Sequence, residues 1–157
     1  MELFETMLQH TSVRSFTQQK LTDELREQLI LSAQSASSSN FLQAFSIIEI
    51  TEAKKRKKIE QIANFPVDNG EKGALYIFVA DLNKHAQVLA MNNDSMEHLR
   101  TMESLVVSIV DATLAAQSMA IYAESVSLGI CYVGGIRNNL FQMKDILELP
   151  ELTYPVF

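Results

Sequence analysis

The sequence predicts a single α+β domain, residues 1–157, because strand-like and helix-like segments are mixed along one chain without repeats. Two segments, 45–50 and 74–81, are rich in β-branched and aromatic residues, as strands are. A long helical stretch within 94–128 is apolar at its centre. A length of 157 residues suits one domain that can bury a sizeable core.

The helices are predicted from apolar spacing and from caps. The opening segment "ELFETMLQ" places four apolar side chains on one helical stripe, namely Leu3, Phe4, Met7 and Leu8. Thr22 is expected to cap a second helix that runs to about Ser35, with acidic residues in its first turn. Thr51 is expected to cap a third helix over 52–63, and 138–149 reads as the last one.

The strands are predicted from apolar runs. Segment 74–81 is apolar almost throughout, which is typical of a strand covered on both faces. "ICYV", residues 130–133, is predicted to be another short buried strand that turns at Gly134 and Gly135. The final residues, 152–157, also have strand character.

The central helical segment, 105–123, is apolar nearly all round and should therefore lie in a core or an interface. Asp111 and Gln117 interrupt it, which disfavours a membrane span. One small subunit is not expected to cover all faces of such a helix. The sequence therefore predicts a homodimer.

Composition excludes several classes of protein. The formal charge of −6 disfavours a general binder of nucleic acid or of anionic membranes. A single cysteine rules out an internal disulfide and a zinc site built from clustered thiols. The acidic amino terminus does not resemble a signal peptide, so we expect a cytoplasmic protein without a metal site.

Some conspicuous residues are expected to be structural. The basic run "KKRKK", 54–58, shares its predicted helix with glutamates and is interpreted as a solvated helix face. Cys131 sits among apolar residues and is expected to be a buried, unreactive thiol. His85 and His98 lie on polar helical stretches and are expected at the surface.

Three segments carry candidate binding residues. His10, Thr11, Ser12 and Arg14 gather donors that suit a phosphate or an electron-rich heterocycle, although a helix-to-loop transition has the same composition. "SSSNFLQ", 37–43, reads equally well as a polar loop.

The third segment is "YVGGIRNN", residues 132–139. Its glycines would let the backbone approach a flat ligand beside Arg137. They could equally form a tight turn before a helix capped by Asn138 or Asn139. No Rossmann, P-loop, nucleophile-elbow or zinc-protease motif is present in the sequence.

In order and spacing, the chain resembles the nitroreductase family, specifically its oxygen-insensitive, NADPH-preferring flavin reductase branch. The resemblance rests on "HTSVRSF", "SAQSASSSNFLQ", "GICYVGGIRNN" and "LELPELTYPVF", and it covers nearly the whole chain. It implies a central, mostly antiparallel sheet flanked by helices, with the long buried helix at a dimer interface. It also implies FMN held non-covalently, in sites built from both subunits of a homodimer.

The resemblance assigns roles to the candidate residues. It places the loop that contains His10 to Arg14, here called the first loop, at the flavin ribityl and phosphate. It places the serines of 37–39 near the flavin of the partner subunit, and Gly134 and Gly135 along the ring. The cofactor-binding residues implied are His10, Thr11, Ser12, Arg14, Ser37, Ser38, Ser39, Gln43, Tyr132, Val133, Gly134 and Gly135, with Arg137 on the NADPH or substrate side.

The implied chemistry belongs to the cofactor, so no catalytic side chain is expected. NADPH or NADH would pass a hydride to flavin N5, and a nitroaromatic, a quinone or free flavin would then take two electrons. Family members continue past "PVF" with a Lys-Pro-Arg-like segment that grips the phosphate, whereas this sequence ends at Phe157. We therefore expect a domain that lacks this segment and binds FMN loosely. The alternative is a degenerate dimer that binds flavin weakly or not at all and acts as an interaction module.

Overall fold

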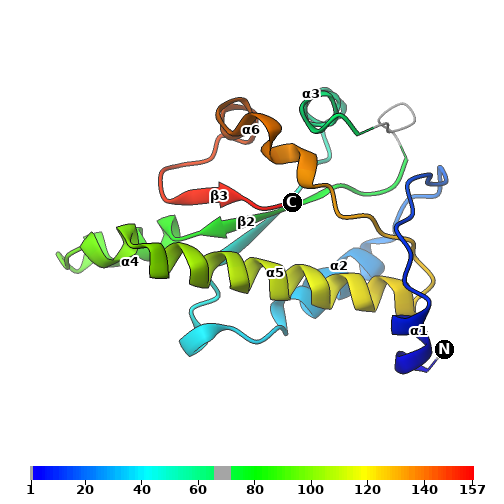
Figure 1. Ribbon diagram of the computed structural model, residues 1–157, viewed down its shortest axis with the longest axis horizontal. Helices are drawn as coiled ribbons and strands as arrows, with labels where there is room; N and C mark the ends of the chain where they lie inside the picture. The colour runs from blue at the N-terminus through cyan, green and yellow to red at the C-terminus, as the bar shows by residue number, and fades with distance from the viewer. Residues whose placement is uncertain (1, 66–71) are drawn as a thin grey trace.

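A three-stranded antiparallel sheet with helices on both faces organises the part of the chain that the structure describes, residues 2–65 and 72–157 of a computed structural model (Figure 1). The strands β1 (Phe45–Glu49), β2 (Tyr76–Asp81) and β3 (Thr153–Pro155) lie in the order β1-β2-β3. Ser46 pairs with Val79. The α+β fold with an antiparallel sheet is confirmed.

The helical elements account for most of the remaining chain. Their bounds are α1 Leu3–Leu8, α2 Asp23–Gln34, η1 Ser39–Phe41, α3 Ala53–Ala63, α4 Asn83–Met91, η2 Glu97–Arg100, α5 Met102–Ser125, η3 Gly134–Asn139 and α6 Leu140–Leu147, where η denotes a short 3-10 helix.

Strand β2 lies at the centre of two apolar layers. Ile77 and Val79 pack with α3 and α6 on one face, whereas Phe78 and Ala80 pack with α2 and α5 on the other. Figure 1 shows the same arrangement, with α3 and α6 on one side of the sheet and α2 and α5 on the opposite side. Successive strand residues point to opposite faces, so burial of both faces explains the continuous apolar run.

Helix α2 begins as predicted, whereas α3 does not. The Thr22 hydroxyl accepts a hydrogen bond from the Leu25 N–H (3.2 Å), which confirms the cap of α2. The residue before α3 is Glu52, and it makes no side-chain cap. The predicted cap at Thr51 is therefore wrong. The preceding Ile50 N–H bonds to the Leu75 carbonyl, so the chain still continues the sheet there and turns into the helix one residue after Thr51.

Replacing Thr22 by alanine is expected to lower the free energy of unfolding by about 1 kcal/mol, because one N–H of the first turn of α2 loses its partner. Thr51→Ala is the matched control and should change stability by less than about 0.5 kcal/mol. Urea denaturation of both variants measures the difference. Equal losses would show that the cap contributes nothing specific.

Helix α5 buries one side and exposes the other. Its buried side includes Ala112, Ala115 and Ala116, which pack against the sheet and α2. By length and composition this helix could cross a membrane. Its packing against both the sheet and α2 instead makes it a core helix, and its opposite side exposes Val106 and Val110.

Helix α1 forms where predicted, but its apolar stripe is not covered. Leu3, Phe4, Met7 and Leu8 are all more than half exposed, and the buried residue of this helix is Thr6. Helix α1 packs near the end of α5 (Figure 1). Its apolar side therefore has no partner within the described chain.

The segment 130–133 is not the predicted strand. Ile130 makes an isolated parallel bridge to Ser12, and residues 131–133 belong to no strand. Among the described residues, Ser12 in the first loop is the β-bridge partner of this segment, and one bridge is too short to form a strand. The glycines that follow open η3, and Asn139 then caps α6 by accepting from the Gln142 N–H (3.1 Å).

The basic run on α3 is only partly a solvated face. Lys54, Lys57 and Lys58 are exposed as predicted, whereas Arg56 is 8% exposed. The Arg56 guanidinium bonds to Glu60 (2.9 Å) and to the carbonyls of residues 72 and 73. These contacts satisfy its donors, so the charge can be buried.

Candidate functional site

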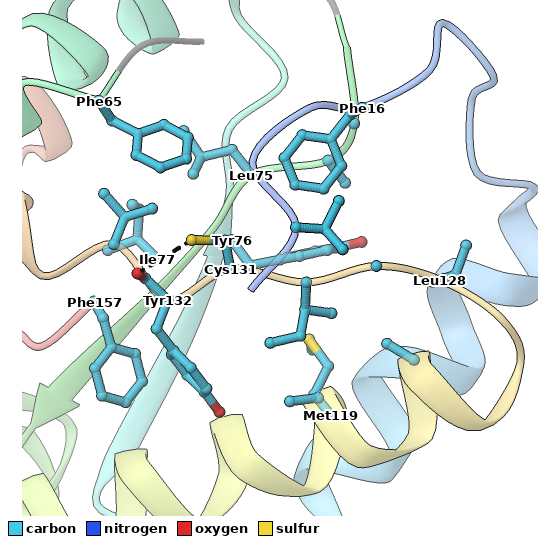
Figure 2. Close-up of a pocket in the computed structure, with 18 of the residues that line it drawn as sticks. Phe16, Phe65, Leu75, Tyr76, Ile77, Met119, Leu128, Cys131, Tyr132 and Phe157 are labelled. Carbon is cyan, nitrogen blue, oxygen red and sulfur yellow. Dashed lines mark hydrogen bonds between the residues drawn. The ribbon is translucent and has the colours of Figure 1, made fainter. Parts of the chain in front are cut away.

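A cavity of about 520 Å³ lies between β2, α3, α5 and the segment 127–133. Its volume is within the range that is typical of small-molecule sites. Figure 2 shows apolar and aromatic side chains around it, and those labelled are Phe16, Phe65, Leu75, Tyr76, Ile77, Met119, Leu128, Cys131, Tyr132 and Phe157.

One wall of the cavity is an edge of the sheet. Strand β3 pairs with residues 79–81 of β2, so the Tyr76–Ile77 end of β2 borders the cavity. The Tyr76 hydroxyl is buried and has no hydrogen-bond partner among the described residues. Burial raises the pKa of Tyr76, and the charge of Arg26 opposes that rise. The wall therefore combines apolar surface with a neutral hydroxyl.

The structure brings two of the predicted binding segments together at this cavity. Ser12 bridges to Ile130, and the Val13 N–H bonds to the Ile130 carbonyl (2.8 Å). Gly129 makes the close approach possible, because a Cβ at that position would lie 2.6 Å from a methyl carbon of Val13. The loop with Ser12 and Arg14 thus runs directly beside the segment that leads to Gly134.

Within the first loop, His10 and Arg14 have different environments. His10 Nδ1 lies 2.7 Å from Glu124 Oε1 on α5, which fixes the orientation of the imidazole. Thr11, Ser12 and Arg14 are exposed. Over residues 2–65 and 72–157, Arg14 makes no ion pair, so its guanidinium is available to an anion.

Tyr132 joins the loop segment to α5 and to the end of β3. Its hydroxyl donates to Gln117 Oε1 (3.2 Å), and its ring meets the Phe157 ring edge-on at 4.9 Å. Burial, reinforced by the negative charge of Glu124, raises the pKa of Tyr132 to about 12. The hydroxyl is therefore neutral at physiological pH. The adjacent Val133 also lines the cavity.

The two glycines that follow have different neighbours. A Cβ on Gly135 would lie 2.1 Å from the Ala63 carbonyl oxygen at the end of α3, so helix packing requires this glycine. For a Cβ on Gly134, the nearest atoms would be those of the Arg137 guanidinium, at 3.0 Å. Helix packing alone thus explains why residue 135 is a glycine, and no ligand is needed to explain it. Contact of Gly134 and Gly135 with a flavin stays a prediction.

Gly135→Ala is expected to destabilise the fold by about 1–3 kcal/mol, because the methyl group would displace the backbone of α3. Gly134→Ala is the control at the neighbouring position. It should cost much less, since the flexible end of Arg137 can move. Thermal and urea unfolding test this difference, and a Gly134→Ala variant as unstable as Gly135→Ala would refute the packing argument.

Arg137 is already engaged. Its Nη1 donates to the Val156 carbonyl and so ties η3 to the end of β3. A position of Arg137 on the NADPH or substrate side stays a prediction. In that role the guanidinium would have to bind the ligand with its remaining N–H groups or give up its hydrogen bond to Val156.

The predicted segment "SSSNFLQ", residues 37–43, lies elsewhere. We call residues 37–44 the serine loop, and none of them lines the cavity. Ser38 Oγ donates to Asp111 Oδ2 on α5 (3.0 Å), and the Gln43 N–H donates to Ser38 Oγ (2.6 Å). Along α5, Asp111 precedes Glu124, the partner of His10, by roughly 20 Å. In one protomer, Ser37, Ser38, Ser39 and Gln43 are therefore separated from the first loop.

Two residues differ from expectation or were overlooked. Cys131 is half-buried and lines the cavity, with its thiol 3.6 Å from the Tyr132 carbonyl oxygen (Figure 2), rather than being buried in a core. Asp111 anchors the serine loop, but the sequence pattern marked it only as an interruption of an apolar helix. The sequence feature that could have pointed to this role is a carboxylate within an otherwise apolar helix. Among the described residues, no group of three or more His, Cys, Asp or Glu side chains could hold a metal ion.

Comparison with known proteins gives consistent matches along this chain. Residues 7–157 match the model of the nitroreductase family. The FMN reductase (NADPH) of Bacillus subtilis is 42% identical over 154 residues, which cover 98% of this chain and 62% of that protein. The chain thus spans less than two thirds of the length of this relative.

Solved structures agree with the fold. The NfrA1 nitroreductase from B. subtilis superposes with a TM-score of 0.95 at 43% identity, covering 99% of this chain and 64% of the other. The NADPH:FMN oxidoreductase from Vibrio harveyi, complexed with NAD+, superposes with a TM-score of 0.89 at 34% identity, covering 99% of this chain and 65% of the other.

Proposed function

This chain belongs to the nitroreductase family, and on that premise we propose that it is an FMN-dependent NAD(P)H oxidoreductase acting as a cytoplasmic homodimer. The observation that carries the proposal is the position of the exposed Arg14 loop directly beside the segment leading to Tyr132 and the two glycines. This arrangement sets the exposed Arg14 guanidinium and hydroxyl donors next to an apolar, aromatic surface.

The residues present fit the two ends of FMN. Arg14 would hold the phosphate through charge-assisted hydrogen bonds, and Ser12 and Thr11 add hydroxyl donors. His10, oriented by Glu124, would meet the ribityl chain. The backbone from Tyr132 to Gly134 would lie along the ring.

FMN, when bound, would supply the redox chemistry, taking a hydride from NADPH or NADH and giving two electrons to a nitroaromatic, a quinone or free flavin. The chain supplies orientation. Tyr132 stays neutral because burial disfavours its phenolate, so its hydroxyl keeps donating to Gln117. Its ring is also fixed against Phe157. No side chain is needed as a general acid or base.

The proposed dimer rests on apolar surface that the described chain does not cover. Val106, Val110 and Leu114 are exposed along one side of α5, at 46%, 48% and 42%. Helix α1, which packs on α5, exposes its whole apolar stripe. Burial of these side chains against a second copy would remove a large apolar area from water. A second copy would also bring a serine loop to each flavin site.

The alternative is a nitroreductase-like dimer that binds flavin weakly and serves as an interaction module. It is favoured by the small number of free cations near the site. Arg137 is bonded to the Val156 carbonyl, whereas Arg14, in the first loop, makes no ion pair with the described residues. A phosphate dianion held by one guanidinium loses several possible charge-assisted contacts.

Anaerobic titration of the purified chain with FMN and then NADPH tests the proposal. We expect FMN fluorescence to be quenched saturably on binding, and the yellow absorption of the bound flavin to bleach on addition of NADPH. Binding without bleaching would contradict the oxidoreductase and favour the alternative. An absence of saturable binding at millimolar FMN would contradict both flavin roles.

A further inference from the structure

Asp111 is a buried carboxylate that holds the serine loop from the middle of α5. The residue is 1% exposed, and both carboxylate oxygens are occupied. Its Oδ2 accepts from Ser38 Oγ (3.0 Å) and from the Ala44 N–H (2.9 Å), and its Oδ1 accepts from the Ser39 N–H (3.3 Å). Donors from both ends of the loop therefore meet on one side chain.

The backbone of the serine loop is strained. Asn40, Phe41 and Gln43 have φ values of 49°, 56° and 46°, in the left-handed region that residues other than glycine rarely adopt. Such conformations persist when surrounding contacts fix them, and they cluster at active sites and ligand clamps. His85 on α4 adds a further contact, since its Nε2–H donates to the Leu42 carbonyl (3.0 Å).

The strained loop presents an aromatic side chain to solvent. Phe41 is 82% exposed, although an aromatic ring at a loop tip gains nothing from water. The loop meets α5 at Asp111, and the neighbouring α5 residues Val110 and Leu114 are exposed as well. An exposed aromatic side chain that becomes buried when two chains associate can act as an anchor of the interface.

We propose that Asp111 is a positioning residue that fixes the serine loop in the shape that meets a second copy of this chain. The loop of one protomer then completes the flavin site formed by the Arg14 loop of its partner. This inference rests on the proposed function, which supplies both the dimer and the flavin site shared between its copies, and it adds the positioning role of Asp111. It assigns one buried carboxylate the task of linking the dimer face to the cofactor site.

Asp111→Asn is the single substitution that tests the role of the carboxylate most specifically. It keeps the size of the side chain, but its amide N–H₂ must face one of the three donors that the carboxylate now accepts. Ser108→Ala is the matched control. Ser108 is equally buried on α5, one turn away, and its hydroxyl bonds to the Leu105 carbonyl of its own helix rather than to the loop.

Mixed dimers distinguish action across the interface from action within one protomer. Dimers carrying Asp111→Asn in both copies, or Arg14→Ala in both copies, should bind FMN at least about tenfold more weakly than the unchanged dimer. A mixed dimer has one copy of each variant. If Asp111 acts on the partner's site, one of its two sites combines an unchanged Arg14 loop with an unchanged serine loop. Half of the sites should then bind FMN with the original affinity.

The opposite result would overturn the proposal. If the mixed dimer has no site with the original affinity, or if Asp111→Asn binds FMN as the unchanged protein does, Asp111 does not position the partner's site. Two measurements without flavin keep the test valid if the chain binds no FMN. Hydrogen exchange at the Ser39 and Ala44 amides should accelerate in Asp111→Asn, and the dimer dissociation constant should rise about tenfold.

In Ser108→Ala, both quantities should stay at their original values. Unchanged exchange and unchanged dimerisation in Asp111→Asn would refute the role of Asp111 by themselves. Absence of FMN binding together with accelerated exchange and weakened dimerisation would instead refute the flavin function and keep the link between Asp111 and the dimer face.

Discussion

Replacing Leu114 by glutamate is expected to convert the proposed dimer into a folded monomer. Leu114 is 42% exposed on α5, one turn after Val110 and one turn before Ser118. A glutamate side chain at this position should therefore reach solvent in the isolated protomer. In the dimer, each copy would lose the burial of a leucine, which is worth roughly 1.5–3 kcal/mol. Each copy would also bury an unpaired carboxylate. We expect the dissociation constant to rise by more than about a hundredfold.

Sedimentation velocity over a range of concentrations measures this change, and circular dichroism checks that the monomer is folded. Phe141→Glu is the control. Phe141 is 87% exposed on α6, on the opposite side of the sheet from α5, and its replacement should leave the dimer intact. A Leu114→Glu protein that sediments as the unchanged dimer would place the interface elsewhere.

Replacing Arg14 by alanine is expected to weaken FMN binding by about 1.5–3 kcal/mol, which is the range for hydrogen bonds to charged groups. This corresponds to a rise in the dissociation constant of roughly 10- to 150-fold. The fold should be unaffected, because Arg14 is exposed and none of its contacts within the described chain is an ion pair.

Fluorescence titration with FMN at constant ionic strength measures the effect of Arg14→Ala. Arg100→Ala is the matched control. Arg100 lies on η2, away from the cavity, and pairs with Glu151 (3.0 Å). The control variant removes the same charge from the protein, so it should leave FMN affinity within about twofold. Equal weakening by both variants would mean that net charge, rather than a contact of Arg14, governs binding.

The regular elements with strong local signals could be predicted from the sequence. The apolar run of β2 indicated burial on both faces, and the cap at Thr22 fixed the start of α2. The apolar stripe of α1 predicted its helix correctly. Its exposure could not be predicted, because whether a stripe is covered depends on the neighbours that the fold provides.

The errors occur where distant contacts override local preference. Residues 130–133 have strand-like composition, but a strand needs a continuous partner, and Ser12 provides a single bridge. Arg56 appeared to belong to a solvated run, yet carbonyl groups at residues 72 and 73 satisfy its guanidinium within the fold. Both outcomes depend on contacts between segments far apart in the sequence.

The candidate site shows the same limit. The family resemblance placed both the donors near Arg14 and the glycine segment at the flavin, and these roles stay predictions. The bridge from Ser12 to Ile130 shows that the two segments run close together just before residue 132. His85 was expected at the surface, but its Nδ1 is buried and its Nε2 contacts the serine loop. The anchoring role of Asp111 needed the folded loop, because its donors come from residues about seventy positions earlier.

A crystal structure of this chain grown with FMN tests the central claim most directly. We predict a two-fold dimer with the flavin phosphate at Arg14, the ring along the backbone from Tyr132 to Gly134, and Ser38 and Ser39 of the partner subunit beside the same flavin. A flavin bound away from Arg14, or one contacted by the first loop and the serine loop of the same protomer, would contradict this account.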